Sequence, residues 1–465
     1  MALIIHPQTG PLRGRLAVPA DKSISHRAVM LAGLAAGRSR LANWLPAGDT
    51  LATLQAMRAL DVPVAVLAQA ANGWQLEVDG RGLRGLAPAG RPLDCRNAGT
   101  CMRLLAGVLA GQPFASTLDG SPQLRRRPMG RLVDPLRQMG ADIRAQAGRA
   151  PLAIRPAQLR GVRYSLPVAS AQVKSALLLA GLYAAGETVL IEPAASRDHS
   201  ERLLAAMGAP IQAESDGAAA GRIALQPLPA GGELRPLALA VPGDFSSAAF
   251  LLAAALIVPG SEVSVQGVGL NPRRTGLLDI LTAMGARPAV SSGAMASDEA
   301  WSASPLSSEP AGDVSLGYAE LRAADLAGEL VVRTIDELPV WAVVASQAAG
   351  VSQLREAAEL RVKEVDRIGL LAAELRKMGA QIEELPDGLR IQGPCRLQGA
   401  AVDSHGDHRL AMALTVAGLA AAGRTSLAGA ACIGDSYPGF VEALASLGAN
   451  LTWHDELSKP EPRMA

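Results

Sequence analysis

The hydrophobic residues of the chain follow a pattern that repeats. A helix-length apolar stretch that ends in glycine and precedes alternating apolar and polar residues occurs six times, at 27–37, 102–111, 174–186, 246–260, 336–350 and 409–423. A change from helical spacing to two-residue alternation predicts a helix followed by a strand. The closing glycines recur at intervals of roughly 75 residues, which indicates a chain built from repeated structural units.

A second pattern occurs once in almost every unit. A helix that ends in Met-Gly-Ala or Leu-Gly-Ala precedes a strand-like segment at 136–143, 204–211, 281–288, 375–382 and 444–451. Glycine at this point accommodates the positive φ with which many helices end. In the first unit, Leu60-Asp61-Val62 stands in its place. We therefore expect two helices and at least three strands in each unit.

Two segments interrupt the repeat. The interval between the fourth and fifth closing glycines is longer, and a Ser- and Ala-rich stretch from Ser291 to Gly312 without apolar periodicity accounts for it as a surface loop. The segment from Arg235 to Asp244 contains Arg-Pro and Val-Pro-Gly, which are typical of a linker, and we place a domain junction there.

The repeat predicts an α+β protein of six units. Periodicity alone leaves two arrangements open, which are a ring of six units and two globules of three units each. A propeller of the WD type is excluded because its blades consist of strands without helices.

Composition limits the possible partners. The chain has 465 residues, of which 49% are hydrophobic, and a formal net charge of +1. These values predict a folded protein of more than one domain, without an overall attraction to nucleic acid or to a membrane surface. No apolar stretch reaches the ~18 residues that cross a bilayer, and the amino-terminal segment lacks the pattern of a signal peptide. The four cysteines show no metal-type or disulfide-type spacing, so we expect no metal site and a cytoplasmic protein.

Basic residues occupy the predicted starts of four of the six first helices. They are Lys22, Arg103, Lys174 and Arg409. A cation is unfavourable at the positive end of a helix dipole, unless an anion lies in front of it. Free backbone N–H groups and small residues such as Gly99 then form a cradle for phosphate or carboxylate.

The second helices carry further basic residues near their starts, at Arg127, Arg197, Lys363 and Arg367, and Glu364 lies among the last two. Taken alone, each start could be an ordinary capped helix, and each group of charges a surface ion pair. Their repetition favours a site for a small polyanion that keeps a carboxylate close enough for proton transfer.

The chain resembles the 5-enolpyruvylshikimate-3-phosphate synthases of the shikimate pathway. The matching motifs are Asp21-Lys22-Ser23-Ile24-Ser25-His26-Arg27, Asn97-Ala98-Gly99-Thr100-Cys101-Met102-Arg103, Arg127-Pro128-Met129-Gly130, Ser170-Ala171-Gln172-Val173-Lys174-Ser175, Arg361-Val362-Lys363-Glu364-Val365-Asp366-Arg367 and Asp407-His408-Arg409-Leu410-Ala411-Met412. The resemblance implies two lobes, each made of three βαβαββ-like units in an inside-out α/β prism, with the site in the cleft between them. It places residues 22–241 in an N-terminal lobe on the shikimate 3-phosphate side, and residues 1–21 and 242–465 in a C-terminal lobe on the phosphoenolpyruvate side.

The resemblance also implies the reaction and the residues that perform it. The enolpyruvyl group of phosphoenolpyruvate would pass to the 5-hydroxyl of shikimate 3-phosphate, with release of phosphate, by addition and elimination. The residues expected to bind shikimate 3-phosphate are Lys22, Ser23, Arg27, Ser170, Ala171, Gln172, Arg197, Asp336 and Lys363. Those expected to bind phosphoenolpyruvate are Lys22, Gly99, Arg127, Gln172, Arg367 and Arg409. Asp336 would be the base at the hydroxyl, Glu364 the proton carrier at the methylene, and Lys22 would lie between both substrates. The family needs no metal or organic cofactor, and we expect a monomer.

The chain departs from the family pattern at two positions. Gln123 stands where some relatives have an arginine, and Asp435 stands where many have a lysine that would protonate the leaving phosphate. Two alternatives are a transferase that acts on a UDP-linked N-acetylglucosamine and a non-catalytic anion-binding relative. The first motif, Lys22-Ser23, and the lack of cysteine near Arg127 argue against the former. Asp336 and Glu364 argue against the latter. The herbicide glyphosate would occupy the phosphoenolpyruvate site, near Gly99.

Overall fold

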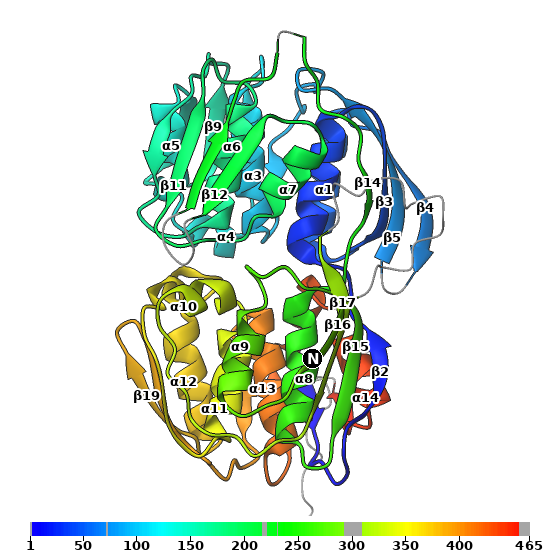
Figure 1. Cartoon of the computed structure of the whole chain (residues 1–465), viewed down its shortest axis with the longest axis vertical. Helices are drawn as coiled ribbons and strands as arrows, with labels where there is room; N and C mark the ends of the chain where they lie inside the picture. Colours follow the sequence, from blue (N-terminus) through cyan, green and yellow to red (C-terminus); the bar gives the residue numbers. More distant parts are fainter. Residues whose placement is uncertain (1, 71–72, 216–220, 230, 293–308, 455–465) are drawn as a thin grey trace, which may run out of the picture.

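The computed structural model describes residues 2–70, 73–215, 221–229, 231–292 and 309–454. Figure 1 shows two lobes stacked along the long axis, with strand β2 (Arg13–Ala17), near the amino terminus, in the same lobe as the later part of the chain. The buried apolar side chains of the described residues form two clusters. Residues between 20 and 241 form the core of the first lobe, and residues 3–18 join residues 245–449 in the core of the second lobe.

The first lobe contains three sheets of four strands among its described residues. Their orders are β14 (Ala238–Ala240), β3 (Ala36–Trp44), β5 (Gly73–Arg81), β4 (Val64–Ala70); β6 (Leu93–Asp94), β7 (Ser116–Asp119), β9 (Arg149–Arg155), β8 (Asp142–Gln146); and β10 (Arg163–Ser165), β11 (Thr188–Glu192), β13 (Gly221–Leu225), β12 (Ile211–Ser215). The helices are α1 (Lys22–Leu34), α2 (Gly48–Ala59), α3 (Gly99–Ala110), α4 (Pro122–Arg126), α5 (Gly130–Gln138), α6 (Ala171–Gly181) and α7 (His199–Ala206).

The second lobe repeats this plan in the part of the chain that is described. Its sheets have the orders β16 (Ala289–Ser292), β17 (Ala311–Gly317), β15 (Glu262–Gly269), β2 (Arg13–Ala17); β18 (Gly350–Leu354), β20 (Gly388–Gly393), β19 (Gln381–Leu385); and β21 (Ala401–Asp403), β22 (Thr425–Ala428), β1 (Ala2–Ile5), β23 (Leu451–His454). The helices are α8 (Phe245–Ile257), α9 (Gly276–Ala283), α10 (Glu329–Thr334), α11 (Leu338–Ser346), α12 (Arg367–Lys377), α13 (His408–Ala420) and α14 (Phe440–Ser446), with the 3-10 helices η2 (Ala358–Val362) and η3 (Ala430–Asp435).

Five of the six described sheets share one topology, which is consistent with the repeat, and the sheet of β18, β20 and β19 has only the antiparallel pairs. In the four-stranded sheets one outer strand pairs in parallel with its neighbour, and the other pairs are antiparallel. Strands distant in sequence complete three of these sheets: β14 joins β3, β2 joins β15, and β1 lies between β22 and β23. The observed fold is thus a mixed α/β fold of small mixed sheets.

The first helix of each unit lies inside its lobe. These helices are α1, α3, α6, α8, α11 and α13, and all 13 residues of α8 are buried. A helix that is apolar on all sides is stable only where it is surrounded by protein, which is why these stretches lack a polar face. Figure 1 shows the sheets on the outside of the lobes.

The helix ends predicted from the Gly-Ala motif are confirmed. Gly140, Gly208, Gly285, Gly379 and Gly448 all have positive φ, between 86° and 104°. In the first unit, Asp61 takes the same role with a φ of 67°. Aspartate is one of the few residues besides glycine that adopt this conformation at modest cost, so the unit keeps its turn without the motif.

Two expectations from the sequence need correction. The segment 235–244, interpreted as a linker, contains strand β14, which belongs to the first sheet. The ends of the predicted surface loop, 291–292 and 311–312, belong to strands β16 and β17, which pair with each other. Residues 293–308 lie outside the described part of the chain.

The chain passes between the lobes twice, and the two passages lie side by side. The backbone N–H of Asp21 donates to Pro242 O at 2.8 Å, and the N–H of Asp244 donates to Pro19 O at 2.9 Å. Asp21 and Asp244 are also the N-caps of α1 and α8. This pairing brings the start of α1, and with it Lys22, to the boundary between the lobes.

Candidate active site

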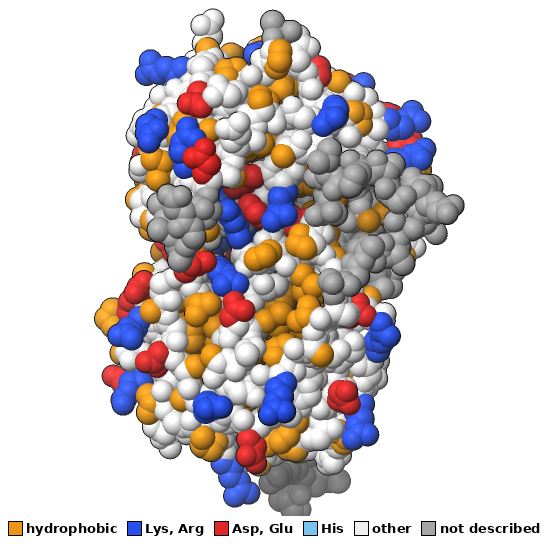
Figure 2. Space-filling model, viewed as in Figure 1, with side chains coloured by type: hydrophobic (Ala, Val, Ile, Leu, Met, Phe, Trp, Pro, Cys, Tyr) orange, Lys and Arg blue, Asp and Glu red, His pale blue; other side chains and the backbone are white. Residues whose placement is uncertain are grey.

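A cleft of about 560 Å³ lies between the two lobes. Its wall includes the starts of α1, α3 and α6 from the first lobe and of α12 and α13 from the second. Figure 2 shows basic and acidic side chains gathered in the hollow between the lobes. Several positive helix ends and basic side chains therefore face the same space, which is suited to anions.

The cleft brings together nearly all of the residues predicted from the sequence. The residues that line it are Lys22, Ser23, Gly99, Arg127, Ser170, Ala171, Gln172, Arg197, Asp336, Lys363, Glu364, Arg367 and Arg409. They come from both lobes and span most of the chain.

Arg27 is the exception among the predicted residues. It is buried behind Ser23, and its guanidinium donates to Ser23 O at 2.9 Å, to Ser175 Oγ at 2.9 Å and to Ser200 Oγ at 2.8 Å. Arg27 is not part of the cleft wall, and in this structure its guanidinium supports the start of α1, so its contact with shikimate 3-phosphate stays a prediction.

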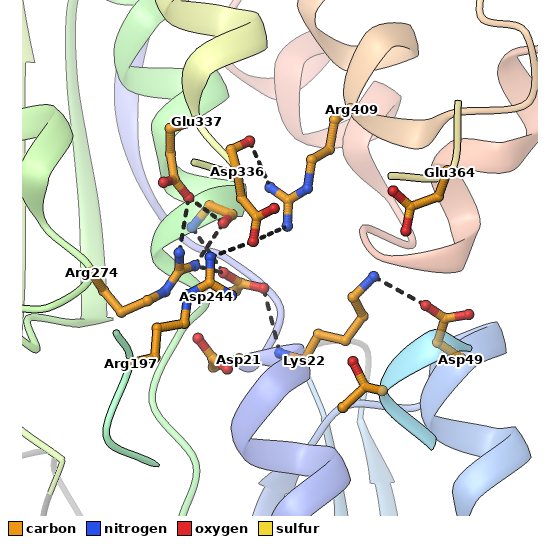
Figure 3. A network of polar contacts seen from close by, with 12 residues as sticks. Asp21, Lys22, Asp49, Arg197, Asp244, Arg274, Asp336, Glu337, Glu364 and Arg409 are labelled. Carbon is orange, nitrogen blue, oxygen red and sulfur yellow. Dashed lines mark hydrogen bonds and ion pairs between the residues drawn. The ribbon is translucent and has the colours of Figure 1, made fainter. Parts of the chain in front are cut away.

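Asp336 lies among arginines from both lobes. Arg197 of the first lobe forms an ion pair with Asp336 Oδ2, and Arg409 Nη2 lies 3.5 Å from the same oxygen. Arg367 Nη1 lies 3.6 Å from Oδ1, and Figure 3 shows Arg197 and Arg409 on either side of the carboxylate. Burial raises the pKa of Asp336, but Arg197 and Arg409 outweigh it and hold this pKa well below 3.8.

Glu364 has a similar environment, and like Asp336 it belongs to the second lobe. Its Oε1 lies 3.2 Å from Arg127 Nη2 of the first lobe, and its Oε2 accepts from Arg367 Nη2 at 2.5 Å. Burial raises the pKa of Glu364, but Arg127 and Arg367 outweigh it and hold this pKa well below 4.5. Both candidate proton carriers are therefore ionised while these arginines contact them.

Arg367 connects the two carboxylates. Its side chain is only 1% exposed, and its Nε donates to Asp407 Oδ2 at 2.8 Å. Asp407 in turn caps α13 by accepting from the backbone N–H groups of Arg409 and Leu410. The cap of one helix thus fixes the arginine at the start of another, which is a rigid base for an anion site.

Lys22 lies at the first residue of α1 and points into the cleft. Its Nζ donates to Asp49 Oδ2 at 3.1 Å, as Figure 3 shows. Asp49 belongs to the first turn of α2, so the contact joins the starts of two helices. His408, at the start of α13, also lines the cleft, and burial together with Lys22 and Arg409 lowers its pKa well below 6.5, which keeps the imidazole neutral.

Gln172 is held by two residues of α3. Arg103 Nη1 donates to its Oε1 at 2.6 Å, and its Nε2 donates to Thr100 Oγ1 at 2.8 Å. Burial, together with the nearby Arg127, lowers the pKa of Arg103 to about 9. Asp49, Arg103 and His408 were not assigned from the sequence. Arg103 and His408 lie within the quoted motifs, whereas Asp49 lies in no motif that could have identified it.

Asp435 lies in the second lobe beside the start of α2. A Cβ added to Gly48 would come within 2.9 Å of Asp435 Oδ1. Burial and the nearby Asp49 raise the pKa of Asp435. This position therefore holds a carboxylic acid with a raised pKa, rather than the cation that the resemblance led us to expect.

The described residues contain no cluster of three or more His, Cys, Asp or Glu side chains that could hold a metal ion. Among the same residues, the helices are too short or too polar for any of them to cross a membrane.

Comparison with known proteins places the chain in a family. The family model of EPSP synthase (3-phosphoshikimate 1-carboxyvinyltransferase) matches residues 7–444. The 3-phosphoshikimate 1-carboxyvinyltransferase of Geobacter sp. (strain M21) is 48% identical over 93% of this chain and 96% of its own length, and that of Desulforudis audaxviator is 48% identical over 96% and 99%. A structure of EPSP synthase from Acinetobacter baumannii, 36% identical, superimposes with a TM-score of 0.82 over 98% of this chain and 100% of its own. The chain therefore belongs to the EPSP synthase family, the 3-phosphoshikimate 1-carboxyvinyltransferases of the shikimate pathway.

Proposed function

We propose that this enzyme binds shikimate 3-phosphate and phosphoenolpyruvate together in the interlobe cleft and joins them by addition and elimination. Residues 22–241 would form the lobe on the shikimate 3-phosphate side, and residues 1–21 and 242–465 the lobe on the phosphoenolpyruvate side. What supports this division is that Ser23, Ser170 and Arg197 come from the first lobe and Arg367 and Arg409 from the second. Gly99 and Arg127 on the phosphoenolpyruvate side, and Asp336 and Lys363 on the shikimate 3-phosphate side, reach the cleft from the opposite lobe.

The observation that carries the proposal is the pairing of Asp336 and Glu364 with arginines of both lobes. Each substrate brings a phosphate and a carboxylate, so four anionic groups need cationic partners. Arginine binds both groups through paired hydrogen bonds. Substrate anions would take over Arg197, Arg409 and Arg127, which leaves Asp336 and Glu364 with fewer cations and raises their pKa toward the range that proton transfer requires.

The chemistry then assigns one proton transfer to each carboxylate. Asp336 accepts the proton of the 5-hydroxyl while that oxygen bonds to C2 of phosphoenolpyruvate. Glu364, protonated in the complex, gives its proton to the methylene carbon, which becomes a methyl group. In the elimination, a methyl proton returns to Glu364 while the C2–O bond to phosphate breaks, and the proton held on Asp336 leaves with the phosphate, so that both carboxylates are ionised again. Lys22, at the boundary between the lobes, would stabilise charge on the tetrahedral intermediate.

The leaving phosphate would depart beside Lys22. In many relatives a lysine stands at position 435, and this chain has Asp435 there. Lys22 lies beside Asp49, and we assign the neutralisation of the leaving phosphate to Lys22. A UDP-N-acetylglucosamine transferase and a non-catalytic binder are not supported, because the matching family model and the two relatives compared above are EPSP synthases.

We also propose that the chain works as a cytoplasmic monomer. What supports a monomer is that both walls of the cleft come from a single chain, so that no second copy is needed to complete it. What supports a reducing compartment is that all four cysteines are free. Sedimentation equilibrium of the substrate-bound enzyme would overturn the first part if it gave a dimer.

The direct test is phosphate release from phosphoenolpyruvate. We expect release that requires shikimate 3-phosphate, and none when UDP-N-acetylglucosamine replaces it. Glu364→Gln and Asp336→Asn should each lose roughly 10²- to 10⁴-fold in kcat, the usual contribution of a positioned acid or base. Glu383→Gln, which changes an exposed carboxylate on β19, is the matched control. Near-normal kcat in either site variant would refute its role.

A further inference from the structure

Gln123 joins the first lobe to the backbone of Glu364. It lies in the short helix α4, and its Nε2 donates to Glu364 O of the second lobe at 3.1 Å. Its Oε1 accepts from Asn97 Nδ2 at 2.7 Å, and Asn97 Oδ1 accepts from Ser121 Oγ at 3.1 Å. The hydrogen bonds of Asn97 fix which end of the Gln123 amide faces Glu364, so a donor is directed at the carbonyl.

The segment that Gln123 holds has little regular structure of its own. Residues 363–366 lie between the 3-10 helix η2 and helix α12. Two other contacts from the first lobe reach this part of the second lobe: Arg131 pairs with Glu359, and Arg127 pairs with the Glu364 side chain. Arg127 lines the cleft and would be engaged by a substrate anion. Gln123 is not part of the cleft wall, so its contact with Glu364 can persist in the substrate complex.

We propose that Gln123 is a positioning residue that holds Glu364 in place for proton transfer across the closed cleft. The inference rests on the proposed role of Glu364 as the proton carrier. Gln123 acts through the backbone of Glu364 and touches no substrate. Its removal therefore leaves both binding sites intact but lets the carboxylate move relative to the methylene carbon. Misplacement of a reacting group by about 1 Å can cost on the order of 10²-fold in rate.

The sharpest probe is Gln123→Glu. Glutamate has nearly the same shape and can still accept from Asn97, but it directs a carboxylate oxygen at the Glu364 carbonyl, and the donor is lost. Gln123→Ala removes the contact without adding a charge. Arg125→Ala is the matched control, since Arg125 lies on the same helix, is exposed and pairs with Asp119 of its own lobe.

We expect Gln123→Ala to lower kcat roughly tenfold and Gln123→Glu to lower it further, with KM for both substrates within about twofold of the wild type. The solvent deuterium isotope effect on kcat should rise in both variants, because proton transfer becomes slower relative to the other steps. Thermal unfolding should be unchanged, and Arg125→Ala should match the wild type in every measurement. A kcat and isotope effect equal to those of the wild type in Gln123→Glu would overturn the inference, as would a loss confined to KM.

A double variant separates this inference from the role of Glu364. If Gln123 acts through Glu364, adding Gln123→Ala to Glu364→Gln should lower the residual rate by less than twofold. A further loss as large as that in the wild-type background would show that Gln123 acts elsewhere. Full activity of Glu364→Gln alone would instead refute the proposed function on which the inference rests.

Discussion

Arg197 and Asp336, 139 positions apart in the sequence, form an ion pair across the cleft. One belongs to the loop before α7 in the first lobe, and the other lies at the entrance to α11 in the second lobe. The pair shows that the lobes contact each other through the groups expected to bind and activate shikimate 3-phosphate. An incoming anion must compete for Arg197, and this competition links binding to the acidity of Asp336.

The acid limb of the pH profile, where kcat/KM falls at low pH, should depend on the ion pair between Arg197 and Asp336. Because the pKa of Asp336 lies well below 3.8, Asp336 stays ionised in the free enzyme, and its protonation should not reduce kcat/KM between pH 7 and pH 5. Arg197→Met removes a cation that lowers this pKa, so the acid limb should move to higher pH. Measurement of kcat/KM for shikimate 3-phosphate against pH tests this. Arg202→Met, which changes a guanidinium paired with Asp198, is the control and should leave the limb in place. An unmoved limb in Arg197→Met would contradict the assignment.

Gly99 should control access to the phosphoenolpyruvate site. A Cβ at this position would lie 2.6 Å from Arg103 Nη1 and 2.8 Å from Arg127 Nη1, so both guanidinium groups would have to move. Gly99→Ala should raise KM for phosphoenolpyruvate. Glyphosate is longer, and the variant should raise its inhibition constant by a larger factor, with a difference of about 1–3 kcal/mol.

The test measures KM for phosphoenolpyruvate and the inhibition constant of glyphosate on the wild type, on Gly99→Ala and on a second glycine variant. A Cβ at Gly130 would meet only Asp134, at an ordinary 3.7 Å, so Gly130→Ala should leave both constants unchanged. Equal fold-changes in the two constants for Gly99→Ala would show that Gly99 does not discriminate between the ligands.

His26 should make the first lobe sensitive to acid. Its Nδ1 contacts Thr53 Oγ1 at 2.6 Å, and burial, with the nearby Lys22 and Arg27, lowers its pKa well below 6.5. The unfolded chain then binds a proton below pH 6.5 that the folded chain does not, so stability falls as the pH decreases. Between pH 7 and pH 5.5 the loss from this residue is about 1 kcal/mol. His26→Gln should reduce the pH dependence of urea unfolding by that amount, whereas the exposed His454 changed to Gln should not. If the free energy of unfolding of His26→Gln depended on pH as steeply as that of the wild type, His26 would be charged in the folded protein.

Local features of the fold could be predicted from the sequence, but long-range pairing could not. The Gly-Ala motif identified five helix ends, because a positive φ strongly favours glycine. The same reasoning missed that Asp61 keeps this turn in the first unit. The partners of β1, β2 and β14 were beyond the repeat pattern, since hydrophobic alternation does not specify which distant strand completes a sheet.

The candidate site followed from the motifs, whereas its internal contacts did not. Cations at helix starts indicated an anion site, and thirteen of the predicted positions line the cleft. Lys174, one of those cations, is instead buried outside the cleft, where it pairs with Glu192 and Glu201. The sequence could not show that Arg27 would be occupied by Ser23, Ser175 and Ser200, because these contacts depend on how α1, α6 and α7 pack. Gln123 had been noted only as a departure from the family pattern. Its contact with Glu364 depends on how the two lobes meet.

Deuterium incorporation into the product shows whether Glu364 gives a proton to the methylene carbon and takes one back. With the reaction run in D₂O, we expect the vinyl methylene of the product to gain deuterium in the wild type, because any of the three methyl hydrogens can return to Glu364. In Glu364→Gln, the exchange rate should fall together with the residual turnover, while the exposed-site control Glu383→Gln exchanges normally. A wild-type product without deuterium at this carbon, or undiminished exchange in Glu364→Gln, would refute the role of Glu364 as the proton carrier.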